Sequence, residues 1–160
     1  MKTFISALLM CTIALASHAQ TSRSVKIAEL QKIIAGSDSV LVVNFWATFC
    51  KPCVHEIPFF QTITEKYKNQ RVKLLLVSLD LPSWFPQKVD SFLQENHYRP
   101  EVLWLNETNA DYFIPKIDTR WSGSIPATYF VNKKTGYTKL FEGEMKEEDF
   151  EKELVLAIGH

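Results

Sequence analysis

Two long apolar runs dominate the pattern of hydrophobic and polar positions along the chain. Val40 to Phe45 and Val72 to Leu79 consist mostly of aliphatic and aromatic residues. A strand with one face in water would alternate, so these runs predict strands buried on both faces. Apolar residues at spacings of three and four predict amphipathic helices over Ser24–Ala35, Lys88–Asn96 and Lys146–Ile158.

Shorter segments complete the predicted fold, together with a helix that follows Cys53. They are strands over Val102–Leu105, Ala127–Asn132 and Tyr137–Phe141, a short helix over Asn109–Ile117 and a hairpin turn at Lys133–Gly136. Because helices and strands alternate before a final hairpin and helix, we expect an α/β fold with a central mixed sheet flanked by helices.

One loop is unusually rich in proline and aromatic residues. Asp80 to Gln87 contains Pro82, Trp84, Phe85 and Pro86. Proline stiffens the loop, and we interpret it as a hydrophobic lid on the core in preference to a substrate contact.

The first nineteen residues have the pattern of a signal peptide. Lys2 is followed by an apolar stretch, Phe4 to Ala16, and by the small-residue site Ser17-His18-Ala19. The stretch is shorter than the roughly 20 residues that span a bilayer. We therefore expect cleavage of residues 1–19, an exported or periplasmic domain over residues 20–160, and no stable membrane insertion. A lipid anchor at Cys11 is a minority alternative, because Met10 is bulky where such processing sites want a small residue.

Composition adds limits on the partners. Of 160 residues, 46% are hydrophobic, and 18 Lys and Arg balance 18 Asp and Glu. Removal of Lys2 with the leader would leave 17 against 18. A near-neutral chain of this length predicts one globular domain, which we expect to be a monomer, with neither nucleic acid nor an anionic membrane as partner.

The candidate chemistry lies in Cys50 and Cys53, the only cysteines that remain after removal of the leader. Positions three apart share one face of a helix, and the positive end of the helix dipole favours a thiolate in the first turn. Thiolate attacks disulfides, so we expect Cys50 to be the nucleophile and Cys53 the resolving thiol. A static disulfide is one alternative, although so short a loop gives only about 2 kcal/mol of stabilisation. A zinc half-site is another, but the chain lacks a second ligand pair, so we expect no metal and no other cofactor.

The order of these features resembles the thioredoxin fold. The resemblance rests on WATFCKPC, Pro58, the later Ile125-Pro126, and the terminal hairpin and helix. The export signal, Asn44, the HEIP segment at 55–58, and VSLD with an additional helix and strand over 78–105 resemble more narrowly the TlpA/ResA-like exported thioredoxins. The resemblance covers roughly residues 41–158 and implies a thioredoxin fold with that helix–strand insert.

The resemblance also implies roles near the two cysteines. Ile125-Pro126 matches the family's cis-proline element, which leaves the Ile125 backbone free to pair with an extended substrate. Trp46 and Phe49 would form the apolar rim of the site, Trp46 also being part of the core.

Glu56 matches a carboxylate of the TlpA/ResA group, whereas Asn44 replaces the buried aspartate of thioredoxins proper. If Glu56 is partly buried, its raised pKa suits it to carry the proton of Cys53. A solvated helix glutamate is an equal alternative. We expect His55, which is turned away from Cys50, to lie on the surface.

The resemblance implies a thiol–disulfide oxidoreductase that reduces disulfides of protein substrates and is recharged by an upstream thiol electron donor. Disulfide oxidase or isomerase activity remains open. A non-catalytic metal chaperone or adaptor is the alternative from another class, although His97, Met145 and His160 are far from the pair in sequence. Peroxidase activity is less favoured, because Thr48 lies two residues before Cys50 and not three.

Overall fold

A single six-stranded mixed sheet is the centre of the computed structural model, which describes residues 21–159. In chain order the strands are β1 (Arg23–Val25), β2 (Val40–Trp46), β3 (Val72–Ser78), β4 (Glu101–Leu105), β5 (Ala127–Asn132) and β6 (Tyr137–Glu142). Their spatial order is β1-β4-β3-β2-β5-β6. The first four in this order are parallel, and β5 and β6 are antiparallel to their neighbours. The predicted mixed α/β sheet is confirmed.

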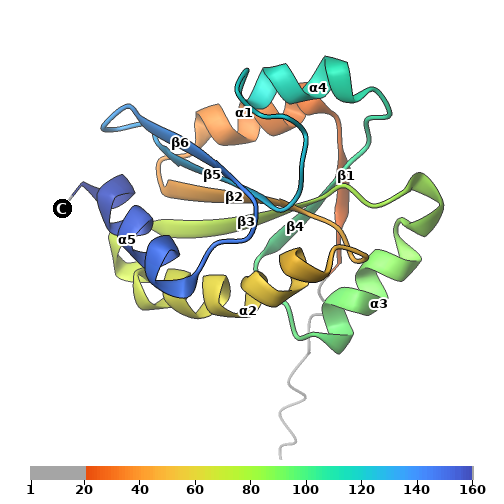
Figure 1. The fold of residues 1–160 in the computed structure, drawn as a ribbon, viewed down its shortest axis with the longest axis horizontal. Coiled ribbons are helices and arrows are strands. Elements are labelled where there is room, and N and C mark those ends of the chain that lie inside the picture. Colours follow the sequence, from red (N-terminus) through yellow and green to blue (C-terminus); the bar gives the residue numbers. More distant parts are fainter. Residues whose placement is uncertain (1–20, 160) are drawn as a thin grey trace, which may run out of the picture.

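Helices cover both faces of the sheet. They are α1 (Ile27–Gly36), α2 (Lys51–Lys66), α3 (Gln87–Glu95), α4 (Ala110–Ile117) and α5 (Glu147–Ile158), with single 3₁₀ turns at Lys68–Gln70 and Pro82–Trp84. Figure 1 shows α1 and α4 on one face and α2, α3 and α5 on the other. Among the helices of residues 21–159, none has the length and apolar character to cross a membrane.

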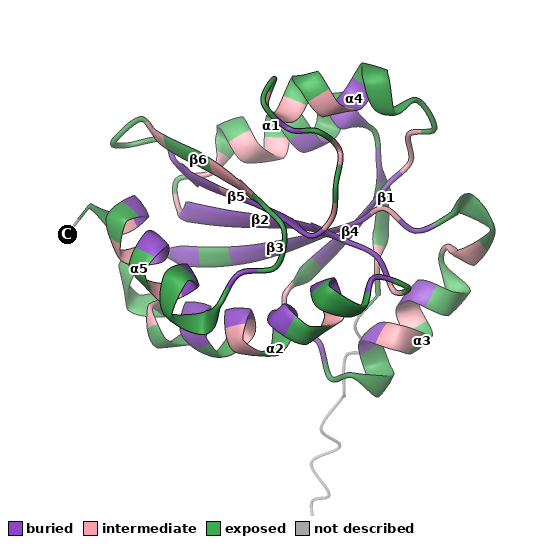
Figure 2. Cartoon of the chain, viewed as in Figure 1, coloured by how far each residue is buried: buried purple, intermediate pink, exposed green. Residues whose placement is uncertain are grey.

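The core lies in two layers, one on each side of the sheet. Beneath α2 and α5, Phe60 and Phe150 stack with ring centroids 3.9 Å apart. On the α1 and α4 side, Phe45 packs against Trp121 at 4.5 Å. All seven residues of β2 are buried, as its continuous apolar run predicts, and Figure 2 shows this strand as one purple band. The strand that leads to Cys50 is therefore fixed from both faces.

The N-terminal boundary was predicted wrongly. Ser24, expected in the first helix, lies in β1, and α1 begins only at Ile27. Residues 23–25 pair in parallel with residues 103–105 of β4. A three-residue strand is stabilised by this distant partner, so the local spacing of apolar residues does not reveal it.

Helix α2 continues through Pro58, which has no N–H to donate to the carbonyl of Val54. The hydroxyl of Tyr98 donates to that carbonyl at 3.4 Å. Burial raises the pKa of Tyr98 to about 12, so this hydroxyl keeps its proton. Tyr98 thus supplies a donor where proline removes one, and α2 remains a continuous element from the cysteines to Lys66.

Three expectations concern residues outside the described range. The signal peptide over residues 1–19, its cleavage site and lipidation at Cys11 all precede residue 21.

Candidate functional site: a disulfide at the start of α2

Cys50 and Cys53 form a disulfide at the junction of β2 and α2. The S–S distance is 2.05 Å, and the two Cα atoms are 5.3 Å apart. The Cys50 N–H donates to the carbonyl of Ala47 at 3.0 Å, which closes the loop between strand and helix. Cys50 is the N-cap of α2, so its sulfur lies at the positive end of the helix dipole.

The two sulfurs differ in their access to solvent. Cys50 retains 9% of its surface, whereas Cys53 retains none. The Cys50 sulfur also accepts the backbone N–H of Cys53 at 3.4 Å. No acidic residue lies in the first turn of α2, and Lys51 adds a positive charge. After reduction, Cys50 is therefore the sulfur that a partner can reach, in surroundings that favour its thiolate.

Glu56, one turn beyond Cys53, is completely buried. One carboxylate oxygen accepts from Nδ2 of Asn44 at 2.8 Å, and the other accepts from the backbone N–H of Met145 at 3.0 Å. Burial raises the pKa of Glu56 from 4.5 to about 7, against the opposing effect of these two hydrogen bonds. Of the two alternatives from the sequence, the structure shows the buried carboxyl.

Asn44 connects this carboxyl to the sheet. Its Nδ2 also donates to Thr128 Oγ1 at 3.1 Å, across the β2–β5 pair. Its Oδ1 is buried and has no hydrogen-bond partner within the described chain. The amide thus serves Glu56 as a donor.

The predicted rim residues lie in different environments. Phe49 is 54% exposed and contacts Trp84 edge to face, with ring centroids 5.6 Å apart. Trp46 has no exposed surface and packs against Phe92 and Tyr98 in the core. The expected place of Trp46 on the rim is therefore wrong, because β2 turns this side chain inward under α3. Only its expected place in the core is correct.

The Ile125–Pro126 peptide bond is cis, as the resemblance implied. Ile125 is partly exposed and packs against the same core cluster that contains Cys50 and Cys53. The Pro126 carbonyl accepts the N–H of Gly143 at 2.8 Å, two residues before Met145. A second cis bond, Phe85–Pro86, was not predicted.

Asp80 is a residue of the site that sequence reasoning did not single out. Its carboxylate accepts from the Thr48 N–H at 3.1 Å, from the Thr48 hydroxyl at 2.6 Å and from the Ser78 hydroxyl at 2.8 Å. These bonds fasten the end of β3 to the loop that precedes Cys50. The sequence does contain a signal for Asp80: it is the acidic residue of VSLD and directly follows the predicted buried strand Val72 to Leu79.

His55 lies on the surface, as predicted, and its Nδ1 contacts the carboxylate of Glu144. Glu144 precedes Met145, whose N–H contacts Glu56. This pair therefore joins the first half of α2 to the loop that covers the buried carboxyl.

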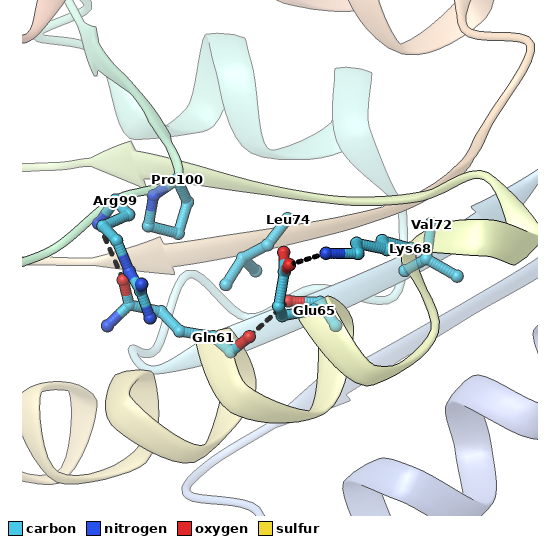
Figure 3. A pocket seen from close by; sticks show the side chains of 8 residues that line it. Gln61, Glu65, Lys68, Val72, Leu74, Arg99 and Pro100 are labelled. Atoms are coloured by element: carbon cyan, nitrogen blue, oxygen red, sulfur yellow. Dashed lines mark hydrogen bonds and ion pairs between the residues drawn. The ribbon is translucent and has the colours of Figure 1, made fainter.

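A separate hollow of about 250 Å³ lies at the other end of α2. Figure 3 shows its walls, in which Glu65 pairs with Lys68 and the backbone N–H of Arg99 donates to Gln61 Oε1 at 2.7 Å. Neither cysteine borders it. Within residues 21–159, no three His, Cys, Asp or Glu side chains are grouped so as to hold a metal ion.

Comparisons with known proteins agree with this architecture. The chain is 27% identical over 112 residues to the thiol-disulfide oxidoreductase ResA of Geobacillus kaustophilus, covering 70% of this chain and 59% of ResA. It is 29% identical over 128 residues to the sporulation thiol-disulfide oxidoreductase A of Bacillus subtilis, covering 74% of this chain and 73% of that protein. The chain thus spans about three fifths of the length of ResA.

Solved structures support the fold assignment. A thioredoxin-related protein from Neisseria meningitidis serogroup B superposes with a TM-score of 0.65 at 24% identity, over 78% of this chain and 88% of the other. The thioredoxin-like fold is therefore confirmed. The model of the AhpC/TSA family matches residues 14–136, which is more than half of the sequence. The protein belongs to the AhpC/TSA family, within its thioredoxin-like members.

Proposed function

We propose that the protein is a thiol–disulfide oxidoreductase that reduces disulfides of other proteins. The observation that carries the proposal is the Cys50–Cys53 disulfide at the start of α2, with only Cys50 accessible and a buried carboxyl one turn beyond Cys53. Similarity to proteins named thiol-disulfide oxidoreductases supports the reaction class.

The reaction begins with the reduced pair. The Cys50 thiolate attacks a substrate disulfide, forms a mixed disulfide and releases one substrate thiolate. The Cys53 thiolate then attacks the Cys50 sulfur, which closes the Cys50–Cys53 bond and releases the second substrate thiolate. Two electrons pass to the substrate, and a dithiol donor returns two electrons to the protein.

Glu56 is the proton carrier in this proposal. Because its pKa is about 7, the carboxyl exchanges protons readily near neutral pH. It takes the proton of Cys53 when that thiol becomes the attacking group, and it returns the proton to the Cys53 sulfur, which leaves as a thiolate, when the dithiol donor reduces the Cys50–Cys53 bond. Asn44 and Met145 hold the carboxyl in place through the hydrogen bonds described above.

Phe49, Ile125 and Pro126 form the substrate contact. Phe49 exposes its ring directly before the reactive cysteine. Within the described chain, the backbone of Ile125 makes no hydrogen bond, so its N–H and C=O are available to an extended substrate strand.

The test is reduction of insulin by the protein with dithiothreitol as donor. Wild type should accelerate the reaction, and Cys50→Ser should abolish the acceleration. With insulin and no added dithiothreitol, pre-reduced Cys53→Ser should accumulate a mixed disulfide through Cys50, visible in mass spectrometry as an adduct that later addition of dithiothreitol removes. A wild-type protein without exchange would refute the reaction class, and a titration against glutathione that gives an oxidising potential would favour an oxidase or isomerase.

The proposed site of action is outside the cytoplasm, on the basis of the signal-peptide pattern in residues 1–19. Cell fractionation followed by N-terminal sequencing should find an exported chain that begins at Gln20. A chain that retains Met1 in the cytosol would contradict this part of the proposal.

A further inference from the structure

An exposed apolar surface borders the reactive cysteine. It consists of Phe49, Leu81 and Trp84, and we refer to it as the Trp84 surface. Phe49 and Leu81 are 54% and 52% exposed, and the half-buried ring of Trp84 meets Phe49 edge to face. Large exposed apolar groups that lie together in this way mark interaction sites more often than single ones do.

The fold holds this surface in place. At one end of the segment, Asp80 binds the backbone and hydroxyl of Thr48, and its own carbonyl accepts the Trp104 indole N–H at 2.8 Å. At the other end, Phe85 stacks on Trp104 with ring centroids 4.3 Å apart. Figure 1 shows the segment between β3 and α3 on the same side of the molecule as the start of α2. Trp84 is therefore held against Phe49, and Leu81 directly follows the anchored Asp80, before any partner arrives.

The border of this surface is positively charged. Lys88 places its ammonium group over the ring of Trp84, and Lys51 directly follows Cys50. Neither lysine forms an ion pair with a described residue, and the first turn of α2 contains no acidic side chain. The start of α2 adds the positive end of its dipole. Charge complementarity thus favours a partner that carries carboxylates.

We propose that the Trp84 surface binds the segment beside the substrate disulfide, and that it selects a large apolar side chain next to the attacked cysteine with acidic residues beyond it. The inference rests on the proposed function. Cys50 exposes only 9% of its surface, and Phe49 precedes it, so a substrate sulfur that reaches Cys50 brings its neighbouring residues against this surface. Leu81 and Trp84 then extend the apolar contact, and Lys51 and Lys88 pair with the carboxylates.

The test uses three disulfide-linked peptide dimers of equal length and the reduced full domain. In the first dimer, phenylalanine precedes the cysteine and glutamates flank the pair. The second has glycine for phenylalanine, and the third has lysines for the glutamates. The neutral reagent 2-hydroxyethyl disulfide reports the exchange chemistry alone. Acid-quenched chromatography gives the second-order rate constant for each compound.

We expect the first dimer to react about tenfold faster than each of the others, and the glutamate preference to weaken in 0.5 M salt. Trp84→Ala and Leu81→Ser should each lower, by about five- to tenfold, the ratio of the rate constant for the first dimer to that for 2-hydroxyethyl disulfide. The matched control is Leu156→Ser, an equally exposed leucine on α5, which should leave this ratio unchanged.

Each contrary outcome identifies what has failed. Equal rates for the three dimers would overturn the proposed role of the Trp84 surface, and so would a preference for the first dimer that both variants retain. In either case, normal exchange with 2-hydroxyethyl disulfide would leave the proposed function intact. A protein that exchanges with neither class of compound would overturn both proposals. A dimer in size-exclusion chromatography that Leu81→Ser dissociates would assign the surface to a second copy of this chain and overturn the substrate assignment.

Discussion

The buried carboxyl of Glu56 makes the stability of the protein depend on pH in a way that Glu56→Gln should remove. In the unfolded chain this group loses its proton near pH 4.5, and in the folded protein near pH 7. The folded state therefore holds the proton more tightly. The corresponding stabilisation is fully present below pH 4.5 and is lost as the pH rises through 7.

The structure gives the size of this effect. Since each pH unit between the two pKa values corresponds to about 1.4 kcal/mol, the interval from 4.5 to about 7 gives about 3 kcal/mol. Glu56 is fully buried, so solvent screening does not reduce this figure as it would at the surface. Between pH 4 and pH 8, wild type should lose about 3 kcal/mol relative to Glu56→Gln.

The assay is urea unfolding of both oxidised proteins at several pH values, followed by tryptophan fluorescence. Keeping the Cys50–Cys53 bond closed removes the titration of the thiols. The comparison uses only the change in the free energy of unfolding with pH. Any cost of replacing glutamate by glutamine that does not vary with pH therefore cancels. Glu65→Gln is the matched control on α2, because Glu65 is exposed and its pKa is lowered by Lys68. A difference between wild type and Glu56→Gln that stays constant from pH 4 to pH 8 would refute the reasoning.

Three substitutions test the supports of the site through urea midpoints. Asp80→Ala should cost about 3 kcal/mol, because it leaves the Thr48 donors unpaired, and a cost below about 1 would contradict this role. Phe150→Ala should cost about 4 kcal/mol by opening a cavity in the core, and a much smaller cost would contradict this by showing that the core collapses around the alanine. Gly123→Ala should cost about 1–2 kcal/mol, because φ is +92° and the new methyl group would lie 2.5 Å from the side chain of Ile114. Gly36→Ala is the control and should be nearly neutral, because its new methyl group would meet nothing within 4 Å.

The local sequence pattern was sufficient to predict those elements whose burial is visible in a few consecutive residues. The continuous apolar run from Val40 predicted a buried strand, and β2 lies between β3 and β5 inside the sheet. The pair Cys50 and Cys53 could likewise be placed at the start of a helix from their neighbours alone. Both predictions depend on residues within a few positions of each other.

Features that depend on residues far away in the chain could not be predicted from the sequence. Ser24 joins a strand only because β4 offers an edge, about 80 residues later. The environment of Glu56 is decided by the backbone of Met145, 89 positions away, so spacing within α2 could not choose between a solvated and a buried carboxyl. The resemblance implies a place for Trp46 on the rim as well as in the core, but the pleat of β2 directs the whole side chain into the core.

The loop over Glu56 gives the site a mechanical property. The reactive sulfurs and the carboxyl belong to the first turns of α2. The cover, Gly143 to Met145, follows the edge strand β6, which ends at the same end of the sheet as β2. Lifting this cover by a few ångströms would let water reach the carboxyl and return its proton affinity toward that of an ordinary glutamate. A partner that presses on or displaces these three residues would thereby change the acidity beneath them without touching a cysteine.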